Sequence, residues 1–543
     1  MDKIIVIGSV AAGTSAAAKA RRNDESVEIT IYDKDNFISY AGCGTPYYIG
    51  GEVGEIEALT PRNPMFFKSR YNIDVFAGYE VIQIDRANKN VKVKNLETSE
   101  VIVDSYDKLI ISTGANALIP QIKNIEKNKV FALRNIKDAV DIKLALTQEK
   151  PKNVVISGSG FIGFELLENL VELGISVSMI ELSDKITPFL DKEMSKMLEN
   201  LVVGKGITIR KETSIVEFTE DKAILSNGEV IDCDMAIISV GVRPNTQIAK
   251  DCGLELGIKD AIKVNKKMQT SDENIYACGD CIETYNQING KACYRPLGST
   301  ANKTGRIAGE NVTGGDIEYR GNLGTCIFKF NELSVGATGF SEDEARAEGY
   351  DVVVCHNLKP DRAEYMGGKD MAIKAIADRK SSKLLGVQIV GYDGVDKRLD
   401  VFATLLTYGA KVEELFHLDL SYAPPFSTAK DPVHSTGMIL DNAINKGRDL
   451  ITLEELNSIK EKYQLVDTRN EDDIRTKGMF DGAVNITLGQ LHNGDIDLDK
   501  NIPIVVYCNK GIMANAAQNI LINKGFKNVK NLSGGQVFYK ASK

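Results

Sequence analysis

Two of the nine cysteines stand in contexts that suit sulfur chemistry. Cys43 lies in the run SYAGCGTPYYIGG, flanked by glycines and just ahead of a helix expected from Pro46. A redox dithiol needs a second cysteine close by, but the position five residues further on is Tyr48. The N-terminus of a helix favours the thiolate, which is the reactive form of cysteine. We therefore expect Cys43 to react with the sulfur of an external partner.

Cys508 ends the apolar run IPIVVYC, and the loop from Asn509 to Met513 then turns into an expected helix. Backbone amides of such a loop can surround a cysteine persulfide and stabilise its negative charge. Lys510 adds positive charge to the loop. This arrangement predicts sulfur transfer.

Cys278 and Cys281 form a CxxC pair in ACGDC, a spacing that is also found in redox and zinc sites. The first of them belongs to an apolar strand, and no second CxxC or pair of histidines completes a metal site. We expect both to be packing residues, and we expect no metal site. The other five cysteines have no such context and are interpreted as inert: Cys233, Cys252, Cys293, Cys326 and Cys355.

The elements that must position Cys43 begin with the strand KIIVIG, a glycine turn, a helix of small residues and the strand EITIYD. This is the pattern of a dinucleotide-binding βαβ unit. Gly8 makes the tight turn, Gly13 allows close helix packing, and Asp33 can bond a ribose hydroxyl. Val10 stands where a second glycine is usual.

A second unit follows in NVVISGSGFIGFELLENLVELGISVSMIE. Gly158, Gly160 and Gly163 lie between a strand and a helix, and the next strand ends at Glu181. A turn that serves packing alone is the alternative interpretation of either unit. Because a carboxylate bonds a free ribose hydroxyl and repels a 2′-phosphate, Glu181 favours NADH over NADPH.

Length and composition limit the number of domains and the classes of partner that the protein can have. At 543 residues the chain exceeds one domain of roughly 100 to 200 residues. A net charge of -9 argues against a nucleic-acid surface. No apolar run is long enough to span a membrane, and the first residues enter a strand without a cleavable leader, so we expect a cytoplasmic protein with no membrane contact.

The strands DKLIISTGA and ENIYACGD, each running into a glycine turn, complete a pattern that resembles the flavoprotein disulfide reductases with two dinucleotide folds. The resemblance covers about residues 1 to 440. It implies bound FAD, a nicotinamide reductant, and an STGA turn near the flavin, with Asp280 on the ribityl chain. The FAD residues that it implies are Gly8, Ala12, Gly13, Asp33, Ser112, Thr113, Gly114 and Asp280, and those for NAD are Gly158, Gly160, Gly163 and Glu181.

The Cys43 run most resembles the coenzyme A-disulfide reductase branch, which uses one cysteine. That resemblance implies proton donation by Tyr422, in SYAPPFSTAKDP, and by Tyr365, each contributed across the interface of a homodimer. Packing tyrosines at the interface are the alternative. The implied coenzyme A residues are Ser15, Lys19, Arg22, Ser39, Arg62, Arg70 and Lys430. A peroxidase or oxidase is less expected because no histidine lies in the first glycine turn.

The segment from YQLVDTRN to NLSGGQ resembles a rhodanese domain. Met513 stands where rhodanese loops often carry arginine, so thiosulfate is a doubtful donor and an inactive, purely interacting domain is the alternative. Asp467 and Arg469 are expected to brace the domain.

The resulting fold class is α/β, with two Rossmann-like domains, an α+β dimerisation domain and a C-terminal α/β rhodanese domain. The expected boundaries are 1–150 with 261–320 for FAD, 151–260 for NAD(P)H, 321–440 for dimerisation, 441–455 for a linker and 456–543 for rhodanese.

The predicted function is reduction of coenzyme A persulfide or coenzyme A disulfide by NADH through FAD and Cys43, with Cys508 handling sulfane sulfur. Two rival functions are an NADH oxidase or peroxidase, and a flavin-based redox sensor whose rhodanese domain only binds a partner.

Overall fold

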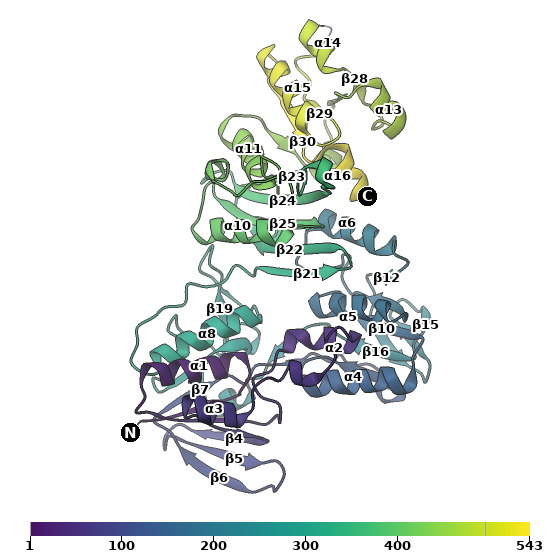
Figure 1. Cartoon of the computed structure of the whole chain (residues 1–543). Helices are drawn as coiled ribbons and strands as arrows, with labels where there is room; N and C mark the ends of the chain where they lie inside the picture. Colours follow the sequence, from purple (N-terminus) through teal and green to yellow (C-terminus); the bar gives the residue numbers. More distant parts are fainter. Residues whose placement is uncertain (1, 495) are drawn as a thin grey trace. The chain divides into compact units, whose positions relative to one another are not determined.

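The computed structural model describes residues 2–494 and 496–543. Contacts divide the chain into two units, one made of residues 2–184 and 207–322 and the other of residues 185–206 and 323–543. Figure 1 follows the chain from the purple N-terminal strands to the yellow C-terminal helices. Each unit is described in turn.

The first unit contains a five-stranded parallel sheet that collects strands from distant parts of the sequence. Its interior strands are almost continuously apolar and buried, as expected when both faces of a parallel sheet are covered. The strand order is β18 (Ile275–Ala277), β7 (Lys108–Ile111), β1 (Lys3–Ile7), β2 (Glu28–Asp33) and β3 (Asp74–Ala77).

Two helices of small residues pack together beside this sheet, α1 (Ala11–Asn23) and α8 (Gly298–Asn311). Gly305 and Gly309 allow the close approach, because a Cβ atom at either position would lie 2.3 or 2.2 Å from the carbonyl oxygens of Ala12 and Ala16. The pairing holds a helix from near residue 300 against the first glycine turn.

A second parallel sheet in this unit has the order β12 (Thr208–Arg210), β11 (Ser176–Ile180), β10 (Asn153–Ser157), β16 (Met235–Ile238) and β9 (Lys129–Ala132). Helices α4 (Ile136–Glu149) and α5 (Phe161–Glu172) accompany it. Strand β9 lies before residue 150, so this sheet takes a strand from the segment that the sequence assigned to the first domain.

Smaller elements complete the first unit. They are two antiparallel sheets, two short strand pairs and three short helices: β4 (Tyr79–Asp85), β5 (Asn90–Asn95), β6 (Val101–Ser105), β13 (Ile215–Phe218), β14 (Lys222–Leu225), β15 (Val230–Asp232), β8 (Ala115–Ala117), β17 (Val242–Pro244), β19 (Thr284–Tyr285), β20 (Ala292–Cys293), α2 (Thr45–Gly50), α3 (Pro64–Tyr71) and α7 (Gln247–Asp251).

The second unit contains an antiparallel sheet with the order β21 (Cys326–Phe330), β22 (Leu333–Gly339), β25 (Leu384–Gly391), β24 (Asp370–Asp378) and β23 (Val352–Pro360). Its helices are α6 (Lys192–Val203), α9 (Glu342–Ala347), α10 (Val395–Thr407) and α11 (Pro432–Asn445). The ammonium of Lys374, 1 % exposed, pairs with Asp191 at 2.9 Å and Glu342 at 2.7 Å. These bonds satisfy a buried cation on the sheet.

The same unit ends in a parallel sheet with the order β26 (Leu450–Ile451), β30 (Val529–Leu532), β29 (Ile504–Tyr507), β27 (Gln464–Asp467) and β28 (Val484–Asn485). Its helices are α12 (Leu453–Ser458), α13 (Glu471–Lys477), α14 (Leu488–Asn493), α15 (Ile512–Asn523) and α16 (Gly535–Ala541). Strand β26 lies in the segment that the sequence assigned to a linker.

His356 of β23 connects the two sheets of this unit. Its ring stacks on Phe538 with centroids 4.3 Å apart, and Ser533 lies 3.0 Å from the ring Nδ1 and accepts the His356 backbone N–H at 2.7 Å. The C-terminal sheet therefore packs directly on the antiparallel sheet through specific side chains.

Candidate functional site: two nucleotide turns and two cysteines

The first glycine turn has the strained geometry that a dinucleotide site needs. Gly8 has φ +103°, and a Cβ atom there would lie 2.3 Å from the Ser112 carbonyl oxygen. A Cβ atom on Gly13 would lie 1.9 Å from the Gly8 carbonyl oxygen. Only glycine fits either position, so the start of α1 stays close to strand β7.

Asp33, at the end of β2, is held by this turn. One carboxylate oxygen accepts hydrogen bonds from the backbone N–H and the hydroxyl of Ser9, both at 2.6 Å. Burial is the largest influence on this carboxyl and raises its pKa. The acid is thereby fixed at the mouth of the turn, where a ribose would lie.

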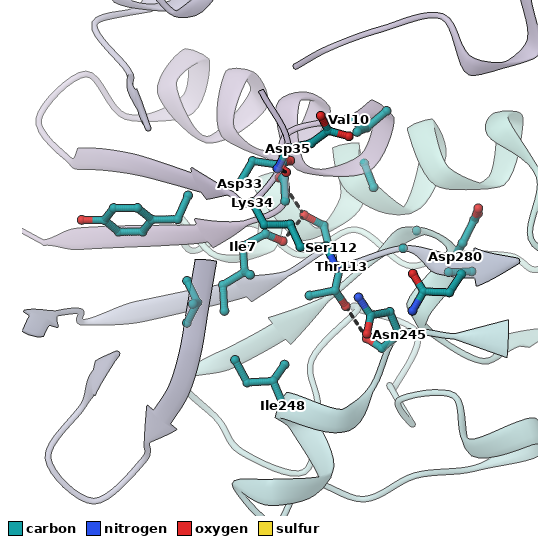
Figure 2. A pocket seen from close by; sticks show the side chains of 18 of the residues that line it. Ile7, Val10, Asp33, Lys34, Asp35, Ser112, Thr113, Asn245, Ile248 and Asp280 are labelled. Atoms are coloured by element: carbon teal, nitrogen blue, oxygen red, sulfur yellow. Dashed lines mark hydrogen bonds between the residues drawn. The ribbon is translucent and has the colours of Figure 1, made fainter. Parts of the chain in front are cut away.

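A cavity of about 450 Å³ opens beside the turn. Figure 2 shows Asp33, Ser112, Thr113 and Asp280 around it, with the Thr113 hydroxyl donating to the Asn245 carbonyl at 2.6 Å. Every residue that the resemblance implied for FAD lines the cavity except Gly13, which serves helix packing. Size, glycine cradle and terminal acid together fit a dinucleotide such as FAD.

Arg134 is a candidate site residue that the sequence reasoning missed. Its guanidinium donates to the Asp280 carboxylate at 2.7 Å and to the Ala115 carbonyl at 2.8 Å, and it lines the same cavity. The available signal was an arginine directly after an apolar strand, in VFALRN. Its partner lies 146 positions away, so no local pattern revealed the pair.

The second glycine turn repeats the geometry of the first. Gly158 has φ +105°, and a Cβ atom there would lie 2.5 Å from the Ser239 carbonyl oxygen. A Cβ atom on Gly163 would lie 2.2 Å from the Gly158 carbonyl oxygen, and Gly160 precedes α5 with open space around it. The turn can admit a pyrophosphate at the helix N-terminus.

Glu181 occupies the place of Asp33 in the second turn. One carboxylate oxygen accepts from the Ser159 hydroxyl at 2.6 Å and from its backbone N–H at 3.0 Å. The other accepts from the Ser183 N–H at 2.9 Å. The two turns thus use the same pairing of a serine with the strand-terminal acid.

Cys43 lies in a single 3-10 turn, Gly42–Gly44, directly before α2. It is partly open to solvent and is a free thiol. Tyr48 is on α2, where its carbonyl accepts from Lys143 of α4 at 2.8 Å and its ring lies 3.8 Å from the same ammonium. The position of an internal resolving cysteine is therefore occupied by a ring held in place by α4.

The groups around Cys43 raise the pKa of its thiol. Partial burial is the largest cause, and the Glu165 and Asp280 carboxylates add to it, whereas Arg134 opposes them. This direction is the reverse of the one that the sequence led us to expect from the helix N-terminus. Glu165 is itself unusual, since burial and the neighbouring Glu168 raise its carboxyl pKa to about 7.

The remaining cysteines of the described chain are also free thiols. Cys278 and Cys281 are buried, and burial raises the pKa of both thiols. The Cys281 thiol lies 3.2 Å from the Cys278 carbonyl oxygen. This CxxC pair is accordingly packed in the core under the flavin motif.

The residues implied for coenzyme A fall into separate groups. On α1, Ser15 bonds Asn302 at 2.8 Å and Lys19 pairs with Glu310 at 2.6 Å, while Arg22 is exposed. Near α3, Arg62 donates to the Ser39 hydroxyl at 3.4 Å, and Arg62 and Arg70 both lie over the Phe66 ring, at 5.6 and 5.7 Å. Lys430 belongs to the second unit.

The two implied proton donors also belong to the second unit. Tyr365 lies in the short helix Glu364–Met366 and is 77 % exposed, and Tyr422 is 53 % exposed. Both phenols are therefore open to solvent and are not packed in the core of their unit.

Cys508 is set differently from Cys43. Its sulfur is buried and accepts the backbone N–H of Gly511 at 3.2 Å, in the loop that leads into α15. Buried side chains hold the loop in place. The fully buried Arg469 pairs with Asp467 at 2.6 Å and donates to the side chain of the loop residue Asn509 at 3.3 Å. Met513, where an arginine is common, packs partly into the domain core.

Comparison with known proteins places this geometry in a family. The profile of the pyridine nucleotide-disulphide oxidoreductases matches residues 2–293, their dimerisation domain matches 325–432, and a rhodanese-like domain matches 452–541. The chain belongs to the pyridine nucleotide-disulphide oxidoreductase family. It is an oxidoreductase of the α/β class predicted from the sequence, with a dimerisation domain and a C-terminal rhodanese domain.

Similar proteins and solved structures agree with this family assignment. The NAD(P)H sulfur oxidoreductase (CoA-dependent) of Pyrococcus furiosus is 36% identical over 438 residues, covering 79% of this chain and 97% of that protein. The crystal structure of reduced Bacillus anthracis CoADR-RHD superimposes with a TM-score of 0.97 at 36% identity, covering 100% and 98% of the two chains. The NAD-dependent persulfide reductase from A. fulgidus gives 0.90 at 34% identity, covering 99% and 100%. The FAD and NAD(P)H cofactors expected from the sequence agree with these findings.

No helix within residues 2–494 and 496–543 is long and apolar enough to cross a membrane.

Proposed function

We propose that this enzyme uses NADH to reduce coenzyme A persulfide or coenzyme A disulfide at Cys43. The observation that carries the proposal is a solvent-accessible free thiol with Tyr48 in the place of a resolving cysteine. A lone thiol must form its mixed disulfide with the substrate itself. The names of the similar proteins from Pyrococcus furiosus and A. fulgidus support the substrate class.

In the proposed reaction FAD supplies electrons, and the protein binds and orients the cofactors. FAD, when bound at Gly8 and Asp280, supplies the two electrons that it takes from NADH. The first glycine turn would provide backbone N–H groups for the FAD pyrophosphate, and Asp33 would accept a hydrogen bond from its ribose. Glu181 does the same for NADH at the second turn and disfavours a 2′-phosphate.

In the protein's own step, the Cys43 thiolate attacks one sulfur of the substrate. The Cys43–sulfur bond forms as the substrate S–S bond breaks, and the leaving sulfur takes the electron pair and a proton. A disulfide releases one coenzyme A thiol, whereas a persulfide releases hydrogen sulfide. Two electrons then return Cys43 to the thiolate and free the bound coenzyme A.

Tyr422 and Tyr365 are proposed to donate the proton to the leaving sulfur from the partner subunit of a homodimer. Their exposure, 53 % and 77 %, and the dimerisation domain around them support the assignment. A phenol is a suitable donor to a thiolate because its pKa of about 10 lies near that of the leaving group. The coenzyme A phosphates are proposed to bind Arg22, Arg62 and Arg70.

Cys508 is proposed to carry sulfane sulfur as a persulfide. The Gly511 N–H at 3.2 Å from Sγ supports this role, because it favours the Cys508 thiolate that would attack the sulfur donor. The charge of the resulting persulfide would lie on the outer sulfur, where other N–H groups of the same loop could bind it. A cytoplasmic location is part of the proposal.

The test is NADH consumption with coenzyme A persulfide, coenzyme A disulfide, oxygen and peroxide in parallel. The proposal expects the coenzyme A substrates to give kcat/KM values well above those of oxygen and peroxide. A coenzyme A adduct on the Cys43 peptide, seen by mass spectrometry, identifies the mixed disulfide. Faster turnover with oxygen or peroxide would establish the oxidase or peroxidase rival instead.

A further inference from the structure

The second unit contains a cavity of about 190 Å³ that lies beside the Cys508 loop. Its walls come from β23, α11, β30 and the loop itself. Gly511, which donates its N–H to the Cys508 sulfur, is one of the lining residues. A ligand in this cavity would therefore contact the loop that holds the reactive sulfur.

The charges of the cavity are strongly one-sided. Four basic residues line it, Lys359, Lys430, Arg448 and Lys510, and no described aspartate or glutamate does. Asp370 pairs with Lys510 at 2.6 Å. Arg448 is held by neutral acceptors, the Asn519 side chain at 2.5 Å and the Lys446 carbonyl at 2.9 Å. Among the described ion pairs, Lys510 is thus the one lysine or arginine of the cavity with a carboxylate partner.

Lys359 shows the effect of this imbalance. Its side chain is half-buried on β23, and no carboxylate of the described chain lies within ion-pair distance of its ammonium. Burial lowers the pKa of Lys359, and the charges of Lys430 and Lys510 lower it further, with only Asp370 acting in the other direction. An anion placed among these three ammonium groups would relieve their mutual repulsion.

Asn531 supplies an independent observation that points to a ligand. It is 6 % exposed on β30 and lines the cavity. Its side-chain N–H donates to the Gly511 carbonyl at 3.1 Å, but its side-chain oxygen has no partner within the described residues. A buried acceptor without a donor is costly, so a bound group that carries an O–H or N–H would satisfy it.

We propose that this cavity binds the oxyanion end of the sulfur-carrying substrate of Cys508, with Lys359, Lys430 and Lys510 around the anion and Asn531 accepting a hydrogen bond from the same ligand. The ligand chemistry is the phosphate of a phosphorylated thiol, because a singly protonated phosphate carries an O–H that can donate to Asn531. Thiosulfate carries no O–H or N–H and is therefore the rival outcome of the test. The role in sulfur delivery rests on the proposed sulfur transfer at Cys508, whereas anion binding does not.

Binding is measured by calorimetry on the FAD-loaded full-length enzyme with inorganic phosphate as the probe. Lys359→Met keeps the apolar stem and removes the charge, so we expect phosphate to bind about 10-fold more weakly at this site. Lys359→Arg should keep the affinity. Lys527→Met is the matched control, because Lys527 is an exposed lysine of the same domain outside the cavity. Equal phosphate affinity in the wild-type and Lys359→Met proteins would overturn the proposal.

Competition identifies the source of the oxyanion. Displacement of phosphate by 4′-phosphopantetheine but not by thiosulfate supports a phosphorylated thiol, whereas displacement by thiosulfate alone would overturn that assignment. If neither displaces phosphate, the cavity does not serve sulfur delivery.

Failure of the proposed function is distinguishable from failure of this inference. Cys508→Ser should leave phosphate binding unchanged, because its side chain does not line the cavity. If Cys508→Ser also retained sulfur transfer, the role of Cys508 would be wrong while the oxyanion site stood. NADH-dependent reduction of coenzyme A disulfide should be unaffected by Lys359→Met.

Discussion

Cys43 and Cys508, the two cysteines to which we assign reactions, have opposite surroundings. Cys43 lies in a short turn with its side chain partly open to solvent. Partial burial raises the pKa of its thiol, and the carboxylates of Glu165 and Asp280 raise it further. Cys508 is buried, with the Gly511 N–H directed at its sulfur and a basic cavity beside its loop. A backbone N–H is thus directed at the sulfur of Cys508, whereas the groups around Cys43 disfavour its thiolate.

This contrast has a chemical reason. A persulfide carrier must hold its charged sulfur between encounters, so permanent backbone donors are useful. A reductase thiol that is most reactive only when substrate and cofactor are present avoids side reactions with other thiols or oxidants. The variants below test whether the two centres are separable in this way.

The largest expected effect belongs to Cys43→Ser. Without the nucleophile, NADH-dependent reduction of coenzyme A disulfide should fall by about 1000-fold or more. Sulfur transfer to cyanide, measured as thiocyanate, should stay near the wild-type rate. Cys252→Ser is the matched control, since Cys252 is a partly buried free thiol of the same unit. If Cys43→Ser kept the wild-type rate of coenzyme A disulfide reduction, the proposed role of Cys43 as nucleophile would be wrong.

Cys508→Ser should give the opposite pattern. Thiocyanate formation should fall by roughly 100-fold or more, because the serine cannot carry a persulfide. Coenzyme A disulfide reduction should persist. A parallel loss of both activities would show that the two centres act as one unit, which contradicts the separation drawn here.

Glu181→Ser tests the reductant site that feeds Cys43. Removing the carboxylate should shift the ratio of kcat/KM for NADH over NADPH toward NADPH by roughly 10- to 100-fold. Glu172→Gln, at the exposed end of the same α5, is the control. An unchanged ratio contradicts the assignment of Glu181 to the ribose.

Tyr422→Phe tests proton donation at the Cys43 centre. The loss of the phenol should lower kcat for coenzyme A disulfide by about 10-fold or more, and the drop should be smaller with a substrate whose leaving thiol is more acidic. Tyr408→Phe is the control, because Tyr408 is 78 % exposed in the same unit. Equal losses for both leaving groups would indicate an interface-packing role.

Glu165→Gln should have the smallest effect on turnover and the clearest effect on pH dependence. The Glu165 carboxyl has a pKa of about 7, so it is negatively charged where Cys43 titrates and repels the thiolate. Its removal should move the alkylation profile of Cys43, followed by peptide mass spectrometry with iodoacetamide, to lower pH. If the pH profile of Cys43 alkylation did not change, the Glu165 carboxylate would not influence the Cys43 thiol.

The same carboxyl affects stability with a definite sign. Its pKa is about 7 in the folded protein but about 4.3 in the unfolded chain. The folded state therefore binds more protons between these values, and wild-type stability should fall as the pH rises through that window. Glu165→Gln should remove this fall in stability. The measurement is the free energy of unfolding by denaturant of the full-length wild-type and variant proteins across this pH range.

Much of the fold and part of the site could be predicted from local patterns. The spacing of Gly8 and Gly13 and of Gly158 and Gly163 depends on the turn itself, because each glycine packs against its neighbours in sequence and one adjacent strand. The family and the rhodanese domain followed from such runs. The positions of β9 in the second sheet and of β26 in the last sheet could not be predicted in this way. A short apolar strand does not show in its own sequence which strand it pairs with.

The sequence by itself determined which residues can do chemistry: a cysteine without an internal partner, two nucleotide turns with their terminal acids, and a second cysteine before a helix. Those features are local, and local spacing fixes them. Tertiary structure alone decided the electrostatics. Arg134 meets Asp280 across 146 positions, and Lys359, Lys430 and Lys510 gather from three separate segments. Charges act through space, so their balance around each sulfur exists only once the chain has folded.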